Sequence, residues 1–164
     1  LMRYIYKKGN GFTFVEVIIV MIILSISFMI FLQALNTGKS VRARSELRTV
    51  QSVIMNSMQN QIRARQFDES TGPTWTAPSA LGKDGNETNL SDFDDIDDFH
   101  LYSENEVSDH PAFGLSVSVS YADLGSGFNV PDPHQQTDFK RVTVTVSHKT
   151  ISDMTDVMII GAGL

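Results

Sequence analysis

The densest group of reactive side chains in the sequence is an acidic run at residues 92–100, DFDDIDDFH. Calcium takes roughly six to eight oxygen ligands, and carboxylates on loops supply them well. An EF-hand loop would need glycine at its sixth position and glutamate at its twelfth, but these positions, counted from Asp92, hold Asp97 and Ser103. The acidic run is therefore a candidate calcium site of another kind, with these ligands: Asp92, Asp94, Asp95, Asp97 and Asp98.

The acidic run also has a simpler interpretation without a metal. Phe93, Ile96 and Phe99 recur at a spacing of three, which is typical of a short turn or helix that docks apolar side chains on a core. The acids between them would then lie in water. The spacing favours this interpretation, and no cofactor other than the candidate calcium ion is expected.

Other residues that could carry out chemistry do not form a recognisable site. The four histidines are dispersed, without the HExxH spacing of a zinc protease. His100 and His110 could complete a metal site beside the acidic run, although surface histidines are the commoner case. The absence of cysteine excludes disulfides, thiol nucleophiles and cysteine-ligated metals. No G-x-S-x-G motif or phosphate-binding glycine loop is present. The sequence does not predict an enzyme.

A different signal is the isolated carboxylate of Glu16 at the edge of an apolar segment. Residues 17–38 carry no charge, and these 22 residues would span about 33 Å as a helix, enough for the hydrocarbon core of a bilayer. Lys7 and Lys8 precede the segment and predict a cytoplasmic N-terminus, with everything after the span outside the cytoplasm. No A-x-A-like cleavage site follows the segment, which disfavours a removable signal peptide.

A lone carboxylate in a membrane costs a few kcal/mol, so Glu16 needs a partner or a task. It could simply reach the headgroups at the interface. Alternatively, a cut between Gly11 and Phe12 would create a new amino terminus one helical turn from Glu16. The ammonium of one copy could then pair with Glu16 of an adjacent copy inside a dry helix bundle. A glycine before the cut offers a protease flexible and uncrowded backbone.

The stretch KKGNGFTFVEVIIVMIILSI resembles the N-terminus of type IV pilins and pseudopilins. The shared features are a basic leader, a Gly-Phe-Thr start and a glutamate four residues beyond the phenylalanine. The resemblance implies cleavage between Gly11 and Phe12 by a prepilin peptidase, N-methylation of Phe12 and a role for Glu16 in subunit registration. It covers residues 7 to about 35. Many major pilins have a proline late in the span, and its absence from residues 17–38 is more similar to a minor pilin or pseudopilin.

A helical pattern continues beyond the span, and its apolar residues recur at spacings of three and four. This stripe consists of Leu47, Val50, Ile54, Met58 and Ile62. One helix over residues 12–66 would be about 82 Å long. The basic residues of its second half lack interleaved aromatics, so we expect a solvated face there and no nucleic acid as a partner.

Strands that could cover the stripe follow in the last third of the chain. Residues 114–123 and 141–148 alternate apolar and polar, mostly hydroxyl, side chains, and residues 156–160 form a third apolar run. Period-two alternation is typical of half-buried antiparallel strands. We expect an α+β fold, in which a long N-terminal helix, transmembrane in its first half, packs on a small antiparallel β-sheet of three to four strands. The resemblance implies the same pilin-like architecture.

The predicted organisation has five segments, and the regions before and after residue 66 differ strongly in charge. Residues 39–65 carry six cations and one acid, whereas residues 66–138 carry fifteen acids and a single lysine. The segments are a leader at 1–11, a transmembrane and assembly helix at 12–38, the soluble half of the helix at 39–66, an acidic variable loop region at 67–113 and a sheet head at 114–164.

With the resemblance, these features predict a minor pilin that is cleaved after Gly11 and assembled into, or at the tip of, a type IV pilus. It would first lie in the inner membrane, with its head in the periplasm. Its partners would be other pilin subunits, the prepilin peptidase and the pilus or secretion assembly platform. The acidic run is also similar to one in minor pilins of the mannose-sensitive haemagglutinin type. The alternatives are a minor pseudopilin of a type II secretion system and a non-polymerising single-span membrane protein with a periplasmic ligand-binding domain.

Overall fold

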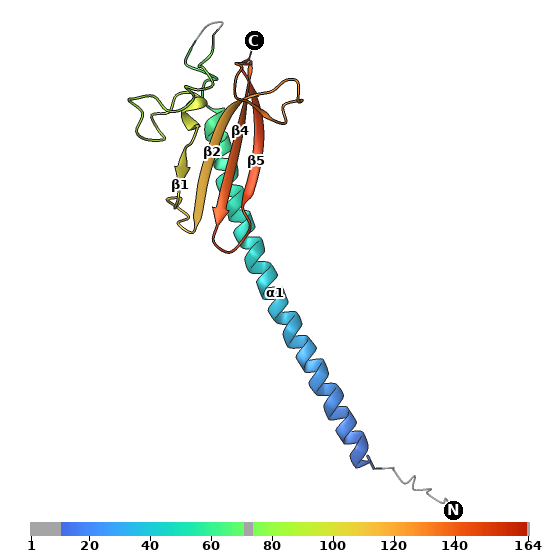
Figure 1. Cartoon of the computed structure of the whole chain (residues 1–164). Helices are drawn as coiled ribbons and strands as arrows, with labels where there is room; N and C mark the ends of the chain where they lie inside the picture. Colours follow the sequence, from blue (N-terminus) through green and yellow to red (C-terminus); the bar gives the residue numbers. More distant parts are fainter. Residues whose placement is uncertain (1–10, 71–73, 164) are drawn as a thin grey trace, which may run out of the picture. The chain divides into compact units, whose positions relative to one another are not determined.

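The computed structural model describes residues 11–70 and 74–163. The chain divides into two compact units, residues 1–45 and 46–164. The leader predicted at residues 1–11, including its two adjacent lysines, lies outside the described residues except for its last glycine. Figure 1 colours the chain from the N-terminal helix to the sheet of the second unit.

One helix, α1 (Phe14–Arg63), contributes residues to both units. It begins two residues later and ends three residues earlier than the predicted helix over residues 12–66. At its C-terminus the backbone N–H groups of Ala64 and Arg65 donate to the carbonyls three residues earlier, at 3.2 and 3.1 Å. These tighter bonds satisfy the last carbonyls and close the helix.

The part of α1 in the first unit is apolar and exposed. By length and composition the helix can cross a membrane, and no side chain of its most apolar stretch is buried. The hydroxyls of Ser25 and Ser27 donate to the carbonyls of Met21 and Ile23, each at 2.8 Å. The two serine hydroxyls within the span are therefore satisfied inside the helix. Such a surface suits lipid or the apolar side chains of other helices.

The second unit contains an antiparallel sheet with the strand order β1-β2-β4-β5 (Figure 1). Strand β3 pairs with β2 off this path. The strands are β1 (Ser103–Glu104), β2 (Phe113–Ala122), β3 (Pro131–Asp132), β4 (Phe139–His148) and β5 (Met154–Gly161). The α+β, pilin-like fold is confirmed. The sheet has five strands rather than three to four, because β1 and β3 are two residues long and too short to show alternation in sequence.

The register of the sheet brings its apolar residues to one face. Val117 and Val119 on β2 oppose Val144 and Val142 on β4. Met158 on β5 continues the row, opposite Val142. Because side chains alternate along a strand, the hydroxyl residues between these positions lie on the other face.

The core lies between this face and the part of α1 in the second unit, which runs along the sheet in Figure 1. The predicted stripe is confirmed, and α1 contributes Ile54, Met55, Met58 and Ile62 to the core, with Leu47 and Val50 partly buried beside them. Two glutamines tie the helix to the sheet. The Gln51 amide donates to the carbonyl of Val146 at 3.1 Å, and the Gln59 amide donates to Asp156 Oδ2 at 2.8 Å.

The segment between α1 and β2 is mostly irregular and contains one short 3-10 helix, η1 (Asp97–Phe99). Phe93, Ile96 and Phe99 are all buried against the core. The rings of Phe93 and Phe99 meet edge to face, with their centroids 5.1 Å apart. The docking predicted from the spacing of three is therefore confirmed.

Candidate functional site

The predicted processing residues lie at the start of the described chain. Phe12 is 80% exposed. A Cβ at Gly11 would meet no atom within 4 Å, so no packing contact among the described residues requires a glycine there. An uncrowded backbone suits access by a protease. The cleavage itself stays a prediction.

Glu16 lies in the first turn of α1 and has a local role that our sequence analysis missed. Oγ1 of Thr13 accepts a hydrogen bond from the backbone N–H of Glu16 at 3.3 Å. Thr13 thus caps the helix, and Thr-x-x-Glu is the sequence of a capping box. The positive end of the helix dipole also stabilises a carboxylate in the first turn.

The surroundings of Glu16 are apolar. Glu16 is the only acid among residues 1–45 of the sequence. Its side chain is exposed, and so are those of Val15 and Val17 on either side. An isolated carboxylate on an apolar helix must be neutralised when that surface enters lipid or a bundle of helices. The pairing of Glu16 between copies stays a prediction.

Residues 6–32 match the family described as the prokaryotic N-terminal methylation motif. The chain carries a pilin-type N-terminal segment. The match indicates a type IV pilin-like or pseudopilin-like substrate of the prepilin peptidase, and proteins with this motif are structural subunits. Neither a curated protein nor a solved structure matches the chain.

The acidic run of this pilin-like chain is packed differently from our expectation. We expected its acids to lie in water, which is wrong for three of the five. Asp95, Asp97 and Asp98 are buried, and only Asp92 and Asp94 are exposed. Because the apolar residues of the acidic run pack on the core, the carboxylates next to them are buried as well. Buried carboxylates require hydrogen bonds or a cation.

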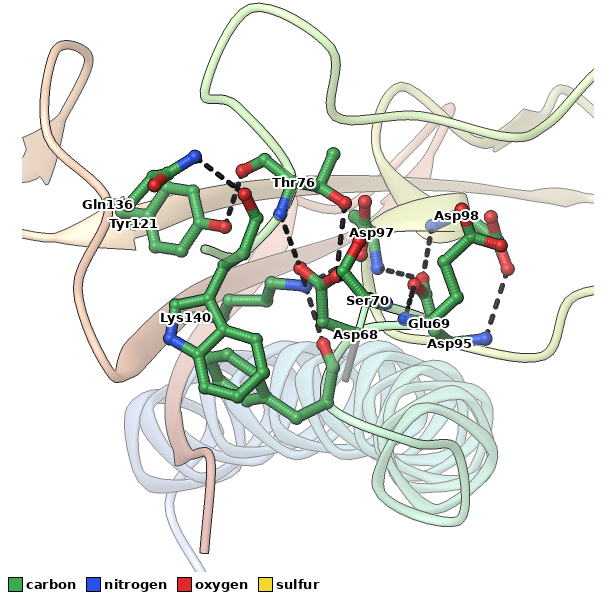
Figure 2. A network of polar contacts seen from close by, with 12 residues as sticks. Asp68, Glu69, Ser70, Thr76, Asp95, Asp97, Asp98, Tyr121, Gln136 and Lys140 are labelled. Atoms are coloured by element: carbon green, nitrogen blue, oxygen red, sulfur yellow. Dashed lines mark hydrogen bonds and ion pairs between the residues drawn. The ribbon is translucent and has the colours of Figure 1, made fainter. Parts of the chain in front are cut away.

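Backbone N–H groups supply part of this requirement. Asp95 accepts hydrogen bonds from the N–H groups of Asp97 and Glu69, both at 2.8 Å. Asp98 Oδ2 accepts from the N–H groups of Asp94 and Asp95, at 2.9 and 3.1 Å. Figure 2 shows the bonds that join Glu69, Asp95, Asp97 and Asp98. Backbone N–H groups of the acidic run thus bond to carboxylates of the same run and fix its conformation.

The cation beside the acidic run is Lys140 on β4, which is fully buried. Its Nζ lies 2.6 Å from Oδ1 of Asp97 and 3.1 Å from Oδ2 of Asp68. It also donates to the carbonyl of Phe67, whose ring centroid lies 4.7 Å away. The three N–H donors of the ammonium therefore have three acceptors (Figure 2). These contacts tie the irregular segment to the sheet.

The buried acids differ in their affinity for protons. Burial raises the pKa of Asp95 to about 7, and the nearby side-chain carboxyl group of Asp97 acts in the same direction. Burial also raises the pKa of Asp98 to about 7. Burial raises the pKa of Asp68 as well, but hydrogen bonds from the backbone of Thr76 and from Lys140 outweigh it and leave the pKa below its usual value. The cluster therefore combines one acid whose pKa is lowered with two whose pKa values are raised to about 7.

The predicted metal site stays a prediction, and its five ligands are not gathered around one point. Asp94, Asp98 and Glu87 each place one carboxylate oxygen in a group of three, and these oxygens all lie within 4.8 Å of one another. The other three predicted ligands accept hydrogen bonds from protein donors. Nδ1 of His100 accepts a hydrogen bond from the N–H of Val119 at 3.2 Å. Calorimetry of the full chain with Ca²⁺ would test for binding.

Sequence reasoning did not single out Lys140 or Asp68. A signal for Lys140 existed, because Val142, Val144 and Val146 face the core and a period of two places residue 140 on the same face. Asp68 lies in an irregular segment that has no such period. Its burial could not be inferred from the pattern of the sequence.

Proposed function

We propose that this chain is a minor pilin, a structural subunit of a type IV pilus. Its precursor lies in the inner membrane with a cytoplasmic N-terminus and a periplasmic head. The prepilin peptidase cleaves it between Gly11 and Phe12, Phe12 is methylated, and the mature chain enters the fibre or its tip. The observation that carries the proposal is the methylation motif at the start of an exposed apolar helix with one acid, Glu16, at its edge.

The proposed assembly chemistry rests on two charges. Cleavage leaves an ammonium on Phe12 beside the N-terminus of α1, where the helix dipole disfavours a cation by roughly 0.3–1 kcal/mol. A carboxylate nearby offsets that cost. The exposed side chain of Glu16 is available to the ammonium of an adjacent copy. Because attraction between charges is much stronger away from water, such a pair favours one axial register between neighbouring helices.

Packing supports the same proposal. Apolar side chains on all sides of α1 are exposed over residues 12–35. A helix that is apolar all round is stable only inside a membrane or among other apolar helices. The span can therefore pass from lipid into a bundle of identical helices without exposing new polar groups.

Two other functions share some of these features. A minor pseudopilin of a type II secretion system would have the same processing and the same helix, and the absence of proline from the span suits either subunit. A non-polymerising single-span membrane protein would keep its leader. The acidic run and its likeness to minor pilins of the mannose-sensitive haemagglutinin type support the pilus.

The test is to determine at which residue the mature chain begins and whether the mature chain is found in fibres. In cells with an active prepilin peptidase, mass spectrometry of extracted protein should find a chain that begins at methylated Phe12. Fibres sheared from the cells should contain that chain. Intact residues 1–11 would overturn the pilin proposal, and a processed chain found only in secretion complexes would identify a pseudopilin instead.

A further inference from the structure

Lys140 and Asp97 place an amine and a carboxyl group in contact inside a site closed to solvent. The two atoms are 2.6 Å apart, and the side chains are 0% and 6% exposed. The contact therefore holds the amine beside the carboxyl group that it would have to attack, and groups held together in this way react much faster than free ones.

Aromatic rings keep this contact dry. The ring of Phe67 lies 4.7 Å from Nζ of Lys140, and the ring of Tyr121 lies 6.0 Å from it. The hydroxyl of Tyr121 is directed away, because it donates to the carbonyl of Thr76 at 2.6 Å. Exclusion of water favours condensation of an amine with a carboxyl group, since water is the product that leaves.

Two more carboxyl groups lie beside the pair (Figure 2): Asp68 accepts a hydrogen bond from Nζ of Lys140, and Asp95 accepts one from the backbone N–H of Asp97. Burial raises the pKa of Asp95 to about 7, so a fraction of this carboxyl group carries a proton near neutral pH, and its Oδ1 already lies 2.8 Å from the backbone nitrogen of Asp97. A proton donor at this place polarises the carbonyl group for attack. Asp68 accepts a hydrogen bond from Nζ of Lys140 at 3.1 Å, and this contact is the path by which a proton of the amine can leave.

From this geometry we propose that the folded chain closes an amide bond between Nζ of Lys140 and Cγ of Asp97. The new N–C bond replaces one C–O bond of Asp97. The ammonium loses two protons, and both leave on the departing oxygen as one water. Asp68 and Asp95 relay these protons and end in their starting protonation states. The step needs no oxidant, reductant or cofactor.

Two effects drive the reaction in the folded chain. Groups held in contact react as if each were present at an effective concentration of about 10⁵–10⁸ M, far above the concentration of liquid water. The amide also removes a pair of buried charges, which are costly to keep away from water. The remaining amide N–H keeps an acceptor, either the carbonyl of Phe67 or the carboxylate of Asp68.

The product would be an internal crosslink between residues 43 positions apart. It would join the acidic run to β4 in the middle of the head, where the ion pairs already hold them. A crosslink restricts the unfolded chain and so stabilises the folded one. The inference concerns the head alone and does not depend on the proposed function in the pilus.

Intact-mass measurement of the purified full chain, denatured and untreated with crosslinker, tests the inference. The mass should be lower by one water molecule than that calculated for the N-terminus found in the same sample. After proteolysis, tandem spectra should show the peptides of Lys140 and Asp97 joined. The unmodified mass in folded wild-type protein, or a bond from Lys140 to another carboxyl group, would overturn the inference.

Variants identify the roles of the groups, each checked for folding by circular dichroism. Lys140→Arg keeps the charge and should have the full calculated mass, whereas the exposed Lys149→Arg should still lose water. Asp97→Asn should lose ammonia in place of water, because the carboxamide can acylate the same amine. A folded Lys140→Arg or Asp97→Asn variant that still loses water would exclude this bond.

Asp95 is the proposed proton donor, and its test is the rate of bond formation. Asp95→Asn should keep the fold but close the bond about 100-fold more slowly, since general acid catalysis contributes at least that factor. Mass spectra taken at intervals after synthesis measure the rate. An unchanged rate would overturn the role of Asp95.

Discussion

The hydroxyl of Thr13 accepts a hydrogen bond from the backbone N–H of Glu16 at 3.3 Å. This contact gives Glu16 a place in the capping box of α1 as well as its proposed place between subunits. The two roles use different parts of the residue. The cap uses the backbone and tolerates glutamine at the same position, whereas pairing with an ammonium needs the charge.

The first prediction separates these roles with Glu16→Gln. The variant should insert and be cleaved like the wild type, but its incorporation into fibres should fall at least about tenfold, because a pair worth more than roughly 1.4 kcal/mol in a dry bundle is lost. Quantitative immunoblots of sheared fibres and of membranes measure the ratio.

The matched control for this experiment is Thr13→Ala. It removes the cap, at a cost of about 1 kcal/mol to the helix end, but keeps the charge of Glu16. Its incorporation should stay close to that of the wild type. Normal incorporation of Glu16→Gln would contradict the charge role, and equal loss in both variants would point to the cap.

The second prediction concerns the buried cation. Lys140→Met keeps the length of the side chain but leaves the carboxylates of Asp68 and Asp97 without their partner. Removing one member of a buried ion pair costs about 3–5 kcal/mol, and the free energy of unfolding should fall by at least this amount, because the variant also cannot form the proposed amide. Thermal and denaturant unfolding followed by circular dichroism would measure it. Lys149→Met, at an exposed lysine, should change little.

The third prediction is a pH dependence of stability. The pKa values of Asp95 and Asp98 are raised from the usual 3.8 to about 7. Between these pH values the folded head holds protons that the unfolded chain has released. Stability should therefore fall as the pH rises from about 4 to about 7 and then level off.

The lowered pKa of Asp68 has the opposite effect at lower pH, because its contribution is present above the usual value of 3.8 and is lost as the pH falls. The melting temperature should thus be highest near pH 4. Asp95→Asn should flatten the slope between pH 4 and 7, and the exposed Asp153→Asn should not. A melting temperature that rises over this interval would contradict the assignment.

The fourth prediction concerns the docking of the acidic run. Phe99 is fully buried, and truncation to alanine should cost about 3–5 kcal/mol through lost burial and a cavity. Leu101, two residues away, is 76% exposed, so Leu101→Ala should be close to neutral. Urea unfolding of both variants measures the difference. Equal small effects would mean that the acidic run is not part of the core.

The elements with a regular period were predictable from the sequence. The helix stripe through Ile54, Met58 and Ile62 and the alternation along β2 and β4 each repeat a local pattern whose geometry is independent of the rest of the chain. The strands β1 and β3 were missed because two residues cannot show a period. For the acidic run, the spacing of the apolar residues predicted that they dock on the core. The sequence did not indicate that three of its acids are buried.

By itself the sequence determined the apolar helix, the motif around Gly11 and Phe12, and the faces of the long strands, because each follows from neighbours within one or two turns. Only the tertiary structure decided that Asp97 is buried and that Lys140 is its partner. Those two residues are 43 positions apart, and Asp68 and Lys140 are 72 apart. Whether a carboxylate lies in water or against a cation depends on which distant segments the fold brings together, and that information is not local.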